Sequence, residues 1–175
     1  GPDRSPRGER SPRIAPGAAR LNDRQRRRSE TVIYQTIGAL LGDQQPVTLP
    51  PSATVLDAAR EMAGRRVGAV AVTEGGDLVG LFTERDLLNR VVAAGKDPQT
   101  VSVAEVMTPQ PVTIRDDQSL AAGLDVMFGN RFRHLPVVNR DGTLVGVMSC
   151  RDVPASYVLM RERWQRARMG LDSAA

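Results

Sequence analysis

Apolar residues recur with helical spacing in two stretches of the chain, and each stretch predicts one amphipathic helix. The apolar positions fall at i, i+3, i+4 and i+7, which places them on one face of a helix. They are Val55, Ala58, Ala59 and Met62 in the first stretch and Leu120, Gly123, Leu124 and Met127 in the second. Ser52 or Thr54 is the expected N-cap of the first helix, and Asp117 or Ser119 that of the second.

Short apolar runs around these helices predict strands. One run precedes each helix, at 47–49 and 112–114, and two more follow it, at 69–73 and 78–82 in the first half and at 135–138 and 144–148 in the second. Gly75-Gly76 and Asp141-Gly142 separate the paired runs and indicate hairpins, because glycine accepts a positive φ. A second helix is expected at 83–93 and from 149–153 onwards. Each half is therefore predicted as β-α-β-β-α.

The two halves also align residue by residue. Val47-Thr48 matches Val112-Thr113 at an offset of 65, and after one inserted residue the offset becomes 66. Seven identities follow: Val72, Gly76, Leu78, Val79, Gly80, Arg85 and Asp86 match Val138, Gly142, Leu144, Val145, Gly146, Arg151 and Asp152. One copy alone is too small to bury a stable core. We therefore predict an α+β fold in which two repeats pack sheet to sheet.

Charge is unevenly distributed and separates the ends from the folded part. Residues 1–30 hold nine arginines against four acidic residues, within a chain of net charge +4. This Pro-, Ser- and Arg-rich segment has too few apolar residues to fold and is predicted to be disordered. The expected organisation is a tail at 1–30, a lead-in helix and linker at 31–46, repeat one at 47–93, a linker at 94–106, repeat two at 107–154, and a C-terminal helix and tail at 155–175.

Composition excludes several classes of site. Cys150 is the only cysteine and His134 the only histidine, which rules out an intramolecular disulfide, a multi-cysteine metal site and a site with two histidines. No metal is expected. No run of about 18 apolar residues suggests a membrane span, and no secretory signal is visible, so a cytoplasmic location is expected.

The candidate chemistry lies at a junction that both repeats share. Residues 80–86 and 146–152 follow the pattern Gly, two apolar residues, Ser or Thr, any residue, Arg, Asp. The hydroxyl and carboxylate at this spacing form a capping box at a helix start. The same geometry suits a nucleotide, because a helix N-terminus attracts phosphate and a carboxylate accepts hydrogen bonds from ribose hydroxyls.

The repeat length, the element order, the paired junctions and the stretch 129–138 together resemble tandem cystathionine-β-synthase-type (CBS) domains of stand-alone bacterial proteins. Such a pair is called a Bateman module. The resemblance covers residues 47–93 and 107–154. It implies that adenine nucleotides of the AMP, ADP or ATP type, or NAD or S-adenosylmethionine, bind in clefts between the repeats. It implies no required cofactor.

The resemblance also implies roles for individual residues. Asp86 and Asp152 would contact ribose, and Thr83 and Ser149 would contact ribose or phosphate. The backbone before the second-repeat strand, including Val112, would line the adenine pocket. Arg133 and His134 would reach phosphate. Their first-repeat counterparts are Val67 and Gly68, so the two clefts are expected to differ in phosphate affinity.

We interpret the chain as a regulatory ligand-binding module and not an enzyme. Its expected partners are an adenosyl ligand, a second copy of the chain and an unidentified regulated protein. The homodimer is predicted from apolar helix faces at 55–62, 87–92, 120–127 and 157–164. Two alternatives remain: an adaptor that binds nucleic acid through its Arg-rich tail, although nucleic acid is not the expected partner, and a small hydrolase that uses Cys150 or His134.

Overall fold

The computed structural model describes residues 36–153 together with Ala155 and Leu159. The tail predicted at 1–30 lies outside the described residues, and so does nearly all of the helix predicted at 155–175. Within the described part, no helix is long and apolar enough to cross a membrane.

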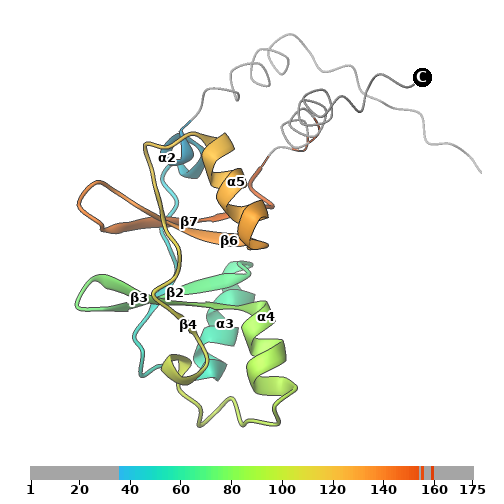
Figure 1. Cartoon of the computed structure of the whole chain (residues 1–175). Helices are drawn as coiled ribbons and strands as arrows, with labels where there is room; N and C mark the ends of the chain where they lie inside the picture. Colours follow the sequence, from blue (N-terminus) through green and yellow to red (C-terminus); the bar gives the residue numbers. More distant parts are fainter. Residues whose placement is uncertain (1–35, 154, 156–158, 160–175) are drawn as a thin grey trace, which may run out of the picture.

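The chain forms two small sheets with helices on their outer sides (Figure 1). The first-repeat elements are β1 (Thr48–Leu49), α3 (Val55–Arg65), β2 (Ala69–Glu74), β3 (Asp77–Thr83), α4 (Glu84–Asp86) and the π-helical η2 (Leu87–Val92). The second-repeat elements are β5 (Ile114–Arg115), α5 (Leu120–Asn130), β6 (His134–Val138) and β7 (Leu144–Ser149). Three further short elements are α2 (Ile37–Leu41) before the first repeat, the 3-10 helix η3 (Val103–Glu105) before the second, and β4 (Thr108–Pro109) at the start of the second.

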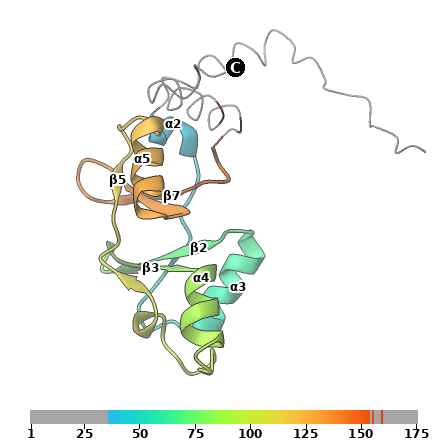
Figure 2. The same cartoon turned by 45° about the vertical axis from the view of Figure 1, so that its right-hand side comes forward.

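The two sheets have matching topology. The first has the order β1-β2-β3-β4, and the second has the order β5-β6-β7. In each, the short first strand pairs parallel to the next, and a hairpin supplies the antiparallel pair. The hairpins face each other across the centre of the molecule, while α3 and α4 lie on the outer side of the first sheet (Figure 2). The predicted α+β fold of two repeats packed sheet to sheet is confirmed.

Both long helices begin at one of the caps expected from the sequence. Thr54 caps α3 through a capping box with Asp57, and Ser119 caps α5 by accepting a hydrogen bond from the backbone N–H of Ala122. The buried face of α5 is Leu120, Gly123, Leu124 and Met127, the four positions that the helical spacing indicated. In α3 the buried residues are Val55, Ala58 and Met62.

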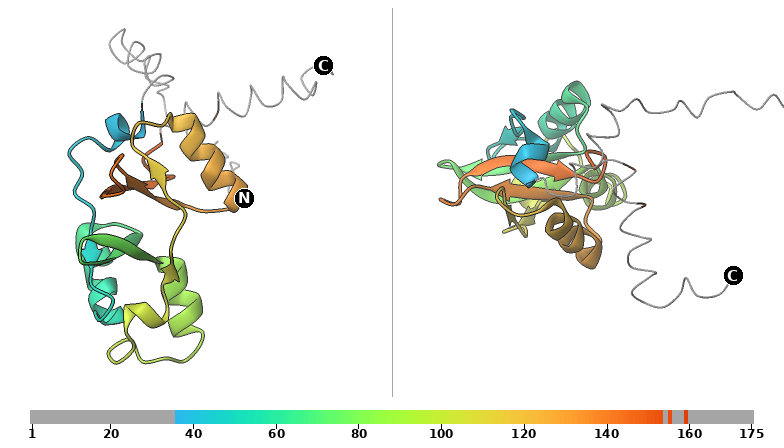
Figure 3. Two further views of the ribbon diagram at one scale, coloured as in Figure 1. Left: turned by 60° about the vertical axis from the view of Figure 1, so that its left-hand side comes forward. Right: turned by 90° about the horizontal axis from the view of Figure 1, so that it is seen from above.

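Each repeat packs against the lead-in segment of the other. Ile37 and Leu41 of α2 lie in the core of the second repeat, whereas Val103 and Val106 lie in the core of the first. Glycines allow this close approach: a methyl group on Gly146 would lie 2.7 Å from Leu41 Cδ1. The chain therefore crosses between the sheets twice, on opposite sides of the molecule (Figure 3).

The crossing before the second repeat corrects one expectation about strands. The strand predicted at 112–114 begins only at Ile114, and Thr108–Pro109 pairs instead with β3 of the first repeat. Val112 therefore lies between the two sheets in the crossing segment. The backbone turns at Gln110, which has a φ of 44°.

The second helix also differs between the repeats. After Thr83 the chain continues helically to Val92, as the sequence predicted. Residues 150–152 instead form a turn and Val153 a bend, so the helix expected from 149–153 onwards does not begin within these residues. Val153 precedes Pro154, and the proline ring disfavours the α conformation of the residue before it. The two junctions therefore have the same motif and different local structures.

Candidate functional site

Thr83 and Asp86 form a complete capping box at the start of α4. The Asp86 carboxylate Oδ2 accepts hydrogen bonds from the Thr83 backbone N–H at 3.0 Å and from the Thr83 hydroxyl at 2.7 Å. The Asp86 N–H donates back to the same hydroxyl at 3.3 Å. Asp86 is buried, with 9% of its surface exposed. The cap thus fixes the carboxylate in one orientation.

Arg90 holds the other oxygen of the same carboxylate. Its Nε lies 3.3 Å from Asp86 Oδ1, and its Nη1 donates to the carbonyl oxygens of Val106 and Met107 at 2.8 Å. A carboxylate offers about four lone-pair sites, and these contacts use three of them. Asp86 therefore has room for about one further hydrogen bond.

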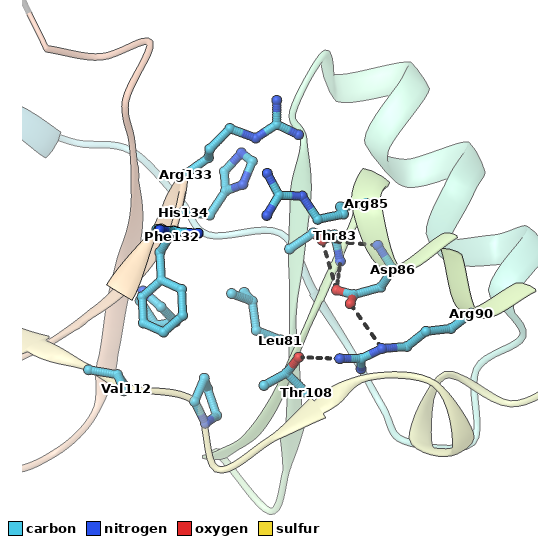
Figure 4. A pocket seen from close by; sticks show the side chains of 13 residues that line it. Leu81, Thr83, Arg85, Asp86, Arg90, Thr108, Val112, Phe132, Arg133 and His134 are labelled. Atoms are coloured by element: carbon cyan, nitrogen blue, oxygen red, sulfur yellow. Dashed lines mark hydrogen bonds and ion pairs between the residues drawn. The ribbon is translucent and has the colours of Figure 1, made fainter. Parts of the chain in front are cut away.

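A cleft of about 230 Å³ opens beside this junction, between the two repeats (Figure 4). It brings together five of the seven predicted site residues: Thr83, Asp86, Val112, Arg133 and His134. Leu81, Pro111, Phe132 and Pro136 add apolar surface, and Arg85, Arg90, Thr108 and Arg131 complete the lining. We call this the first cleft.

Three of the basic groups that line the first cleft lie apart from its apolar side chains. Arg85 from α4 extends toward His134, the first residue of β6, and toward Arg133 just before it, whereas Leu81, Val112 and Phe132 lie on the side away from these basic groups (Figure 4). Neither Arg85 nor Arg133 forms an ion pair with another described residue. Unpaired guanidinium groups beside an apolar wall are suited to an anion attached to a flat apolar group.

A second cleft of about 300 Å³ lies on the other crossing segment. It contains the two remaining predicted residues, Ser149 and Asp152, together with His134. Its other lining residues are Gln44, Gln45, Pro46, Val47, Arg65, Arg66, Val67, Gly68, Ala69, Val147 and Arg151. The seven predicted residues thus divide between two clefts, and His134 contributes to both.

The second junction is capped less completely than the first. Asp152 Oδ2 accepts a hydrogen bond from the Ser149 N–H at 2.8 Å, but the Ser149 hydroxyl accepts from the Arg151 N–H instead of from Asp152. Asp152 is exposed. Its carboxylate is consequently less fixed than that of Asp86 and keeps more capacity for hydrogen bonds.

His134 lies between the clefts and contacts the glycine at its own equivalent position in the first repeat. A methyl group on Gly68 would lie 2.8 Å from His134 Nε2 and 3.1 Å from Glu84 Oε2. Burial lowers the pKa of the imidazole below its ordinary value, and the positive charge of Arg133 lowers it further. His134 is therefore favoured in its neutral form near pH 7.

Two arginines that the sequence did not single out occupy equivalent positions in the clefts. Arg66 ends α3 and lines the second cleft, while Arg131 ends α5 and lines the first. Both adopt the left-handed conformation with a φ of 57°. A residue with a side chain is strained there by about 1–2 kcal/mol. The second cleft thus has basic groups of its own, although the first repeat has Val67 and Gly68 at the positions of Arg133 and His134.

Phe132, Leu81 and Arg85 were also missed as cleft residues. Phe132 stood in the stretch that carried the family resemblance, and Arg85 stood inside the junction motif, but neither pattern showed where the side chain points. Cys150 is exposed, and in the described part of the chain no hydrogen bond joins its thiol to His134.

The sequence of this chain matches the family model of the CBS domain twice, over residues 40–93 and 103–154. The chain belongs to the CBS domain family. The first matched segment begins within α2, so it includes part of the lead-in that packs on the other repeat.

Relatives that contain CBS domains include a bacterial protein. CBS domain-containing protein YhcV of Bacillus subtilis is 37% identical over 114 residues, which are 65% of this chain and 80% of that protein. CBSCBSPB3 of Arabidopsis thaliana is 38% identical over 103 residues. These cover 58% of this chain and only 18% of the Arabidopsis protein, so the chain spans about a fifth of that relative.

A solved CBS structure is similar over most of the described fold. The CBS domain protein PAE2072 from Pyrobaculum aerophilum, complexed with AMP, has a TM-score of 0.66 and 32% sequence identity. The similarity covers 73% of this chain and 96% of that one.

Proposed function

We propose that this CBS pair is a regulatory module that binds adenine nucleotides in the clefts between its repeats and catalyses no reaction. The observation that carries the proposal is the first cleft, where Thr83 and Asp86 of one repeat meet Val112, Arg133 and His134 of the other. The AMP complex of the similar Pyrobaculum protein supports the same class of ligand.

The adenine ring is assigned to the apolar side of the first cleft. Phe132 and Val112 are partly exposed there, with 39% and 47% of their surfaces accessible. A flat aromatic base that covers them removes apolar surface from water, which is worth about 25 cal/mol per Å². The crossing backbone at 110–112 is assigned to the ring edge, apart from the Gln110 N–H, which donates to the Val79 carbonyl oxygen at 3.0 Å.

The ribose is assigned to Asp86. Because about one lone pair of this carboxylate is left, we expect one hydrogen bond from a ribose hydroxyl to Oδ1 rather than two. The Thr83 hydroxyl already donates to Asp86, so toward a ligand it can act only as an acceptor.

The phosphate is assigned to Arg85 and Arg133. Both guanidinium groups lie at the same side of the cleft (Figure 4), and neither has an acidic partner among the described residues. A guanidinium binds phosphate oxygens in a bidentate manner. AMP should therefore bind more tightly than adenosine.

A thermal-shift series tests this function. The full chain is heated with AMP, ADP, ATP, NAD, S-adenosylmethionine and adenosine. Each ligand is tested with the wild type and with the Asp86→Asn variant. A ligand at 100 times its Kd stabilises the folded state by about 2.7 kcal/mol, which gives a clear rise in Tm. At least one adenine nucleotide should raise the Tm of the wild type, and Asp86→Asn should reduce that rise. No shift with any of them would contradict the proposal, and release of a product from any ligand would favour the hydrolase alternative.

We also propose that two copies of the chain associate. The faces at 55–62 and 120–127 are used by the cores of the repeats and are not left for a partner, contrary to the reasoning from sequence. Leu88 and Val92, one helical turn apart, are 59% and 62% exposed. Replacing both by aspartate should convert a dimer to a monomer in light scattering. A monomeric wild type would contradict the proposal.

A further inference from the structure

His134 is the one described residue that lines both clefts. It is on β6 at the centre of the molecule, where its imidazole lies against Gly68 of the opposite repeat. Gly68 has no side chain, so the ring approaches the backbone of the first repeat closely, with the Glu84 carboxylate beside it, and both His134 and Gly68 line the second cleft. A single titratable ring therefore belongs to the wall of two binding sites.

Charged groups reach His134 from each element around it. Glu84 and Arg85 come from α4, Arg133 directly precedes His134 in the chain, and Arg151 and Asp152 come from the turn after β7. Arg65 and Arg66 line the same second cleft. Glu84 and Asp152 favour the imidazolium, but burial and the arginines outweigh them, and the pKa lies below its ordinary value. The neutral form of the ligand-free ring is thus favoured at pH 7.

We propose that His134 couples the two clefts: a phosphate-bearing ligand in either cleft causes the shared imidazole to take up a proton from solvent, and the imidazolium then strengthens phosphate binding in the other cleft. This inference rests on the proposed function, because it requires a phosphate-bearing ligand in the clefts.

The sign of the coupling follows from simple electrostatics. A phosphate monoester has a charge of about −1.5 to −2 at pH 7, and a nearby opposite charge favours the ionised form of a titratable group. The first phosphate therefore raises the pKa of His134. The second phosphate meets a ring that is already positive, and by thermodynamic reciprocity each ligand promotes the binding of the other.

Two consequences distinguish this coupling from ordinary phosphate binding. At a pH below the pKa of His134 in the ligand-free protein, the imidazole is already charged, so the coupling disappears at low pH. Because one imidazole takes up only one proton, the proton uptake of the two clefts is less than additive. Adenosine has no phosphate and should cause no uptake.

The test uses the fact that His134 is the only histidine in the chain. Its Cε1–H signal in NMR of the full-length protein reports its pKa without ambiguity. We expect a pKa below 6.5 in the free protein, a rise of about one pH unit or more with saturating AMP, and no change with adenosine. AMP should also raise this pKa in Asp86→Asn and in Asp152→Asn at saturation, each compared with its own free form.

Calorimetry above pH 7, where the phosphate is already a dianion, measures the coupling itself. His134→Gln should bind two AMP molecules without the cooperativity of the wild type and without proton uptake. If AMP binds but the pKa of His134 stays constant, or rises in only one of the two aspartate variants, the inference is wrong.

Pyrophosphate separates this inference from the proposed function. If AMP fails to bind, the nucleotide function is wrong, and the same NMR titration is run with pyrophosphate, which needs only the basic groups. A raised pKa in both aspartate variants then supports the shared histidine. An unchanged pKa with saturating pyrophosphate overturns it.

Discussion

The imidazole of His134 packs against Gly68, the residue that occupies the equivalent position in the other repeat. A Cβ on Gly68 would approach Nε2 to 2.8 Å and Cε1 to 3.0 Å. The two copies of the repeat thus meet at equivalent positions. This contact is possible because one copy has the imidazole of His134 where the other has glycine, which has no side chain. This pairing places a single histidine between the two clefts.

Gly68→Ala should therefore destabilise the protein by about 1–3 kcal/mol, the usual effect of added bulk at a packed contact. Denaturant unfolding measures this loss. Combining Gly68→Ala with His134→Ala removes the clash and should recover most of the stability, so the two changes are non-additive.

Gly64→Ala is the matched control for this substitution. Gly64 lies in α3 with no atom near its missing Cβ, so alanine should stabilise the helix by up to about 1 kcal/mol. If Gly68→Ala were as stable as Gly64→Ala, the packing of His134 on Gly68 would be contradicted.

The two junction aspartates should contribute unequally to stability. Asp86 is buried and accepts three hydrogen bonds or ion-pair contacts, so Asp86→Asn should lower the free energy of unfolding by about 1–3 kcal/mol. Asp152 is exposed and its cap is incomplete, so Asp152→Asn should change it by no more than about 0.5 kcal/mol. Equal losses in chemical denaturation would show that the two caps do not differ as described.

Replacing the two left-handed arginines by glycine should raise the free energy of unfolding, whereas the aspartate substitution at position 86 lowers it. Arg66→Gly and Arg131→Gly relieve strain of about 1–2 kcal/mol but add flexibility that costs about 0.5–1 kcal/mol. Each ligand-free variant should gain about 0.5–1 kcal/mol. Arg65→Gly, one residue earlier and within α3, should instead lose about 1 kcal/mol. A loss of Tm in all three would contradict the strain at residues 66 and 131.

The lowered pKa of His134 makes stability depend on pH. Below the ordinary value of about 6.5, the unfolded chain binds a proton at this histidine more readily than the folded chain does. The free energy of unfolding should therefore fall as pH decreases from about 6.5 toward the folded-state pKa. Unfolding of the wild type and of His134→Gln across this window isolates the effect, and parallel pH profiles would refute it.

Much of the fold was predictable from the sequence because its signals are local. The helical spacing identified the buried face of α5, and the Gly-Gly pair identified the turn of the first hairpin, where Gly75 and Gly76 both have positive φ. The junction motif identified Thr83 and Asp86. The sequence did not show that α2 packs on the other repeat, because that contact depends on where the chain crosses between the sheets.

The clefts were less predictable for the same reason. Alignment of Arg133 and His134 with Val67 and Gly68 predicted that the two clefts differ in phosphate affinity. The structure places His134 in both clefts and adds Arg66 and Arg151 to the second. A residue-by-residue match within a repeat contains no information on which copy contributes to which cleft. The corresponding assignments of ribose and phosphate contacts stay predictions.

The most direct test of the nucleotide-binding account is calorimetry of AMP and adenosine with the wild type and Arg133→Ala. Arg133 is exposed, has no acidic partner among the described residues and lines the first cleft, so its removal should leave the fold intact. We predict that the variant loses AMP affinity in the first cleft by about 1.5–3 kcal/mol, roughly 10- to 150-fold, while its adenosine affinity is unchanged. Failure of the wild type to bind AMP, or equal AMP affinity in both proteins, would contradict the account.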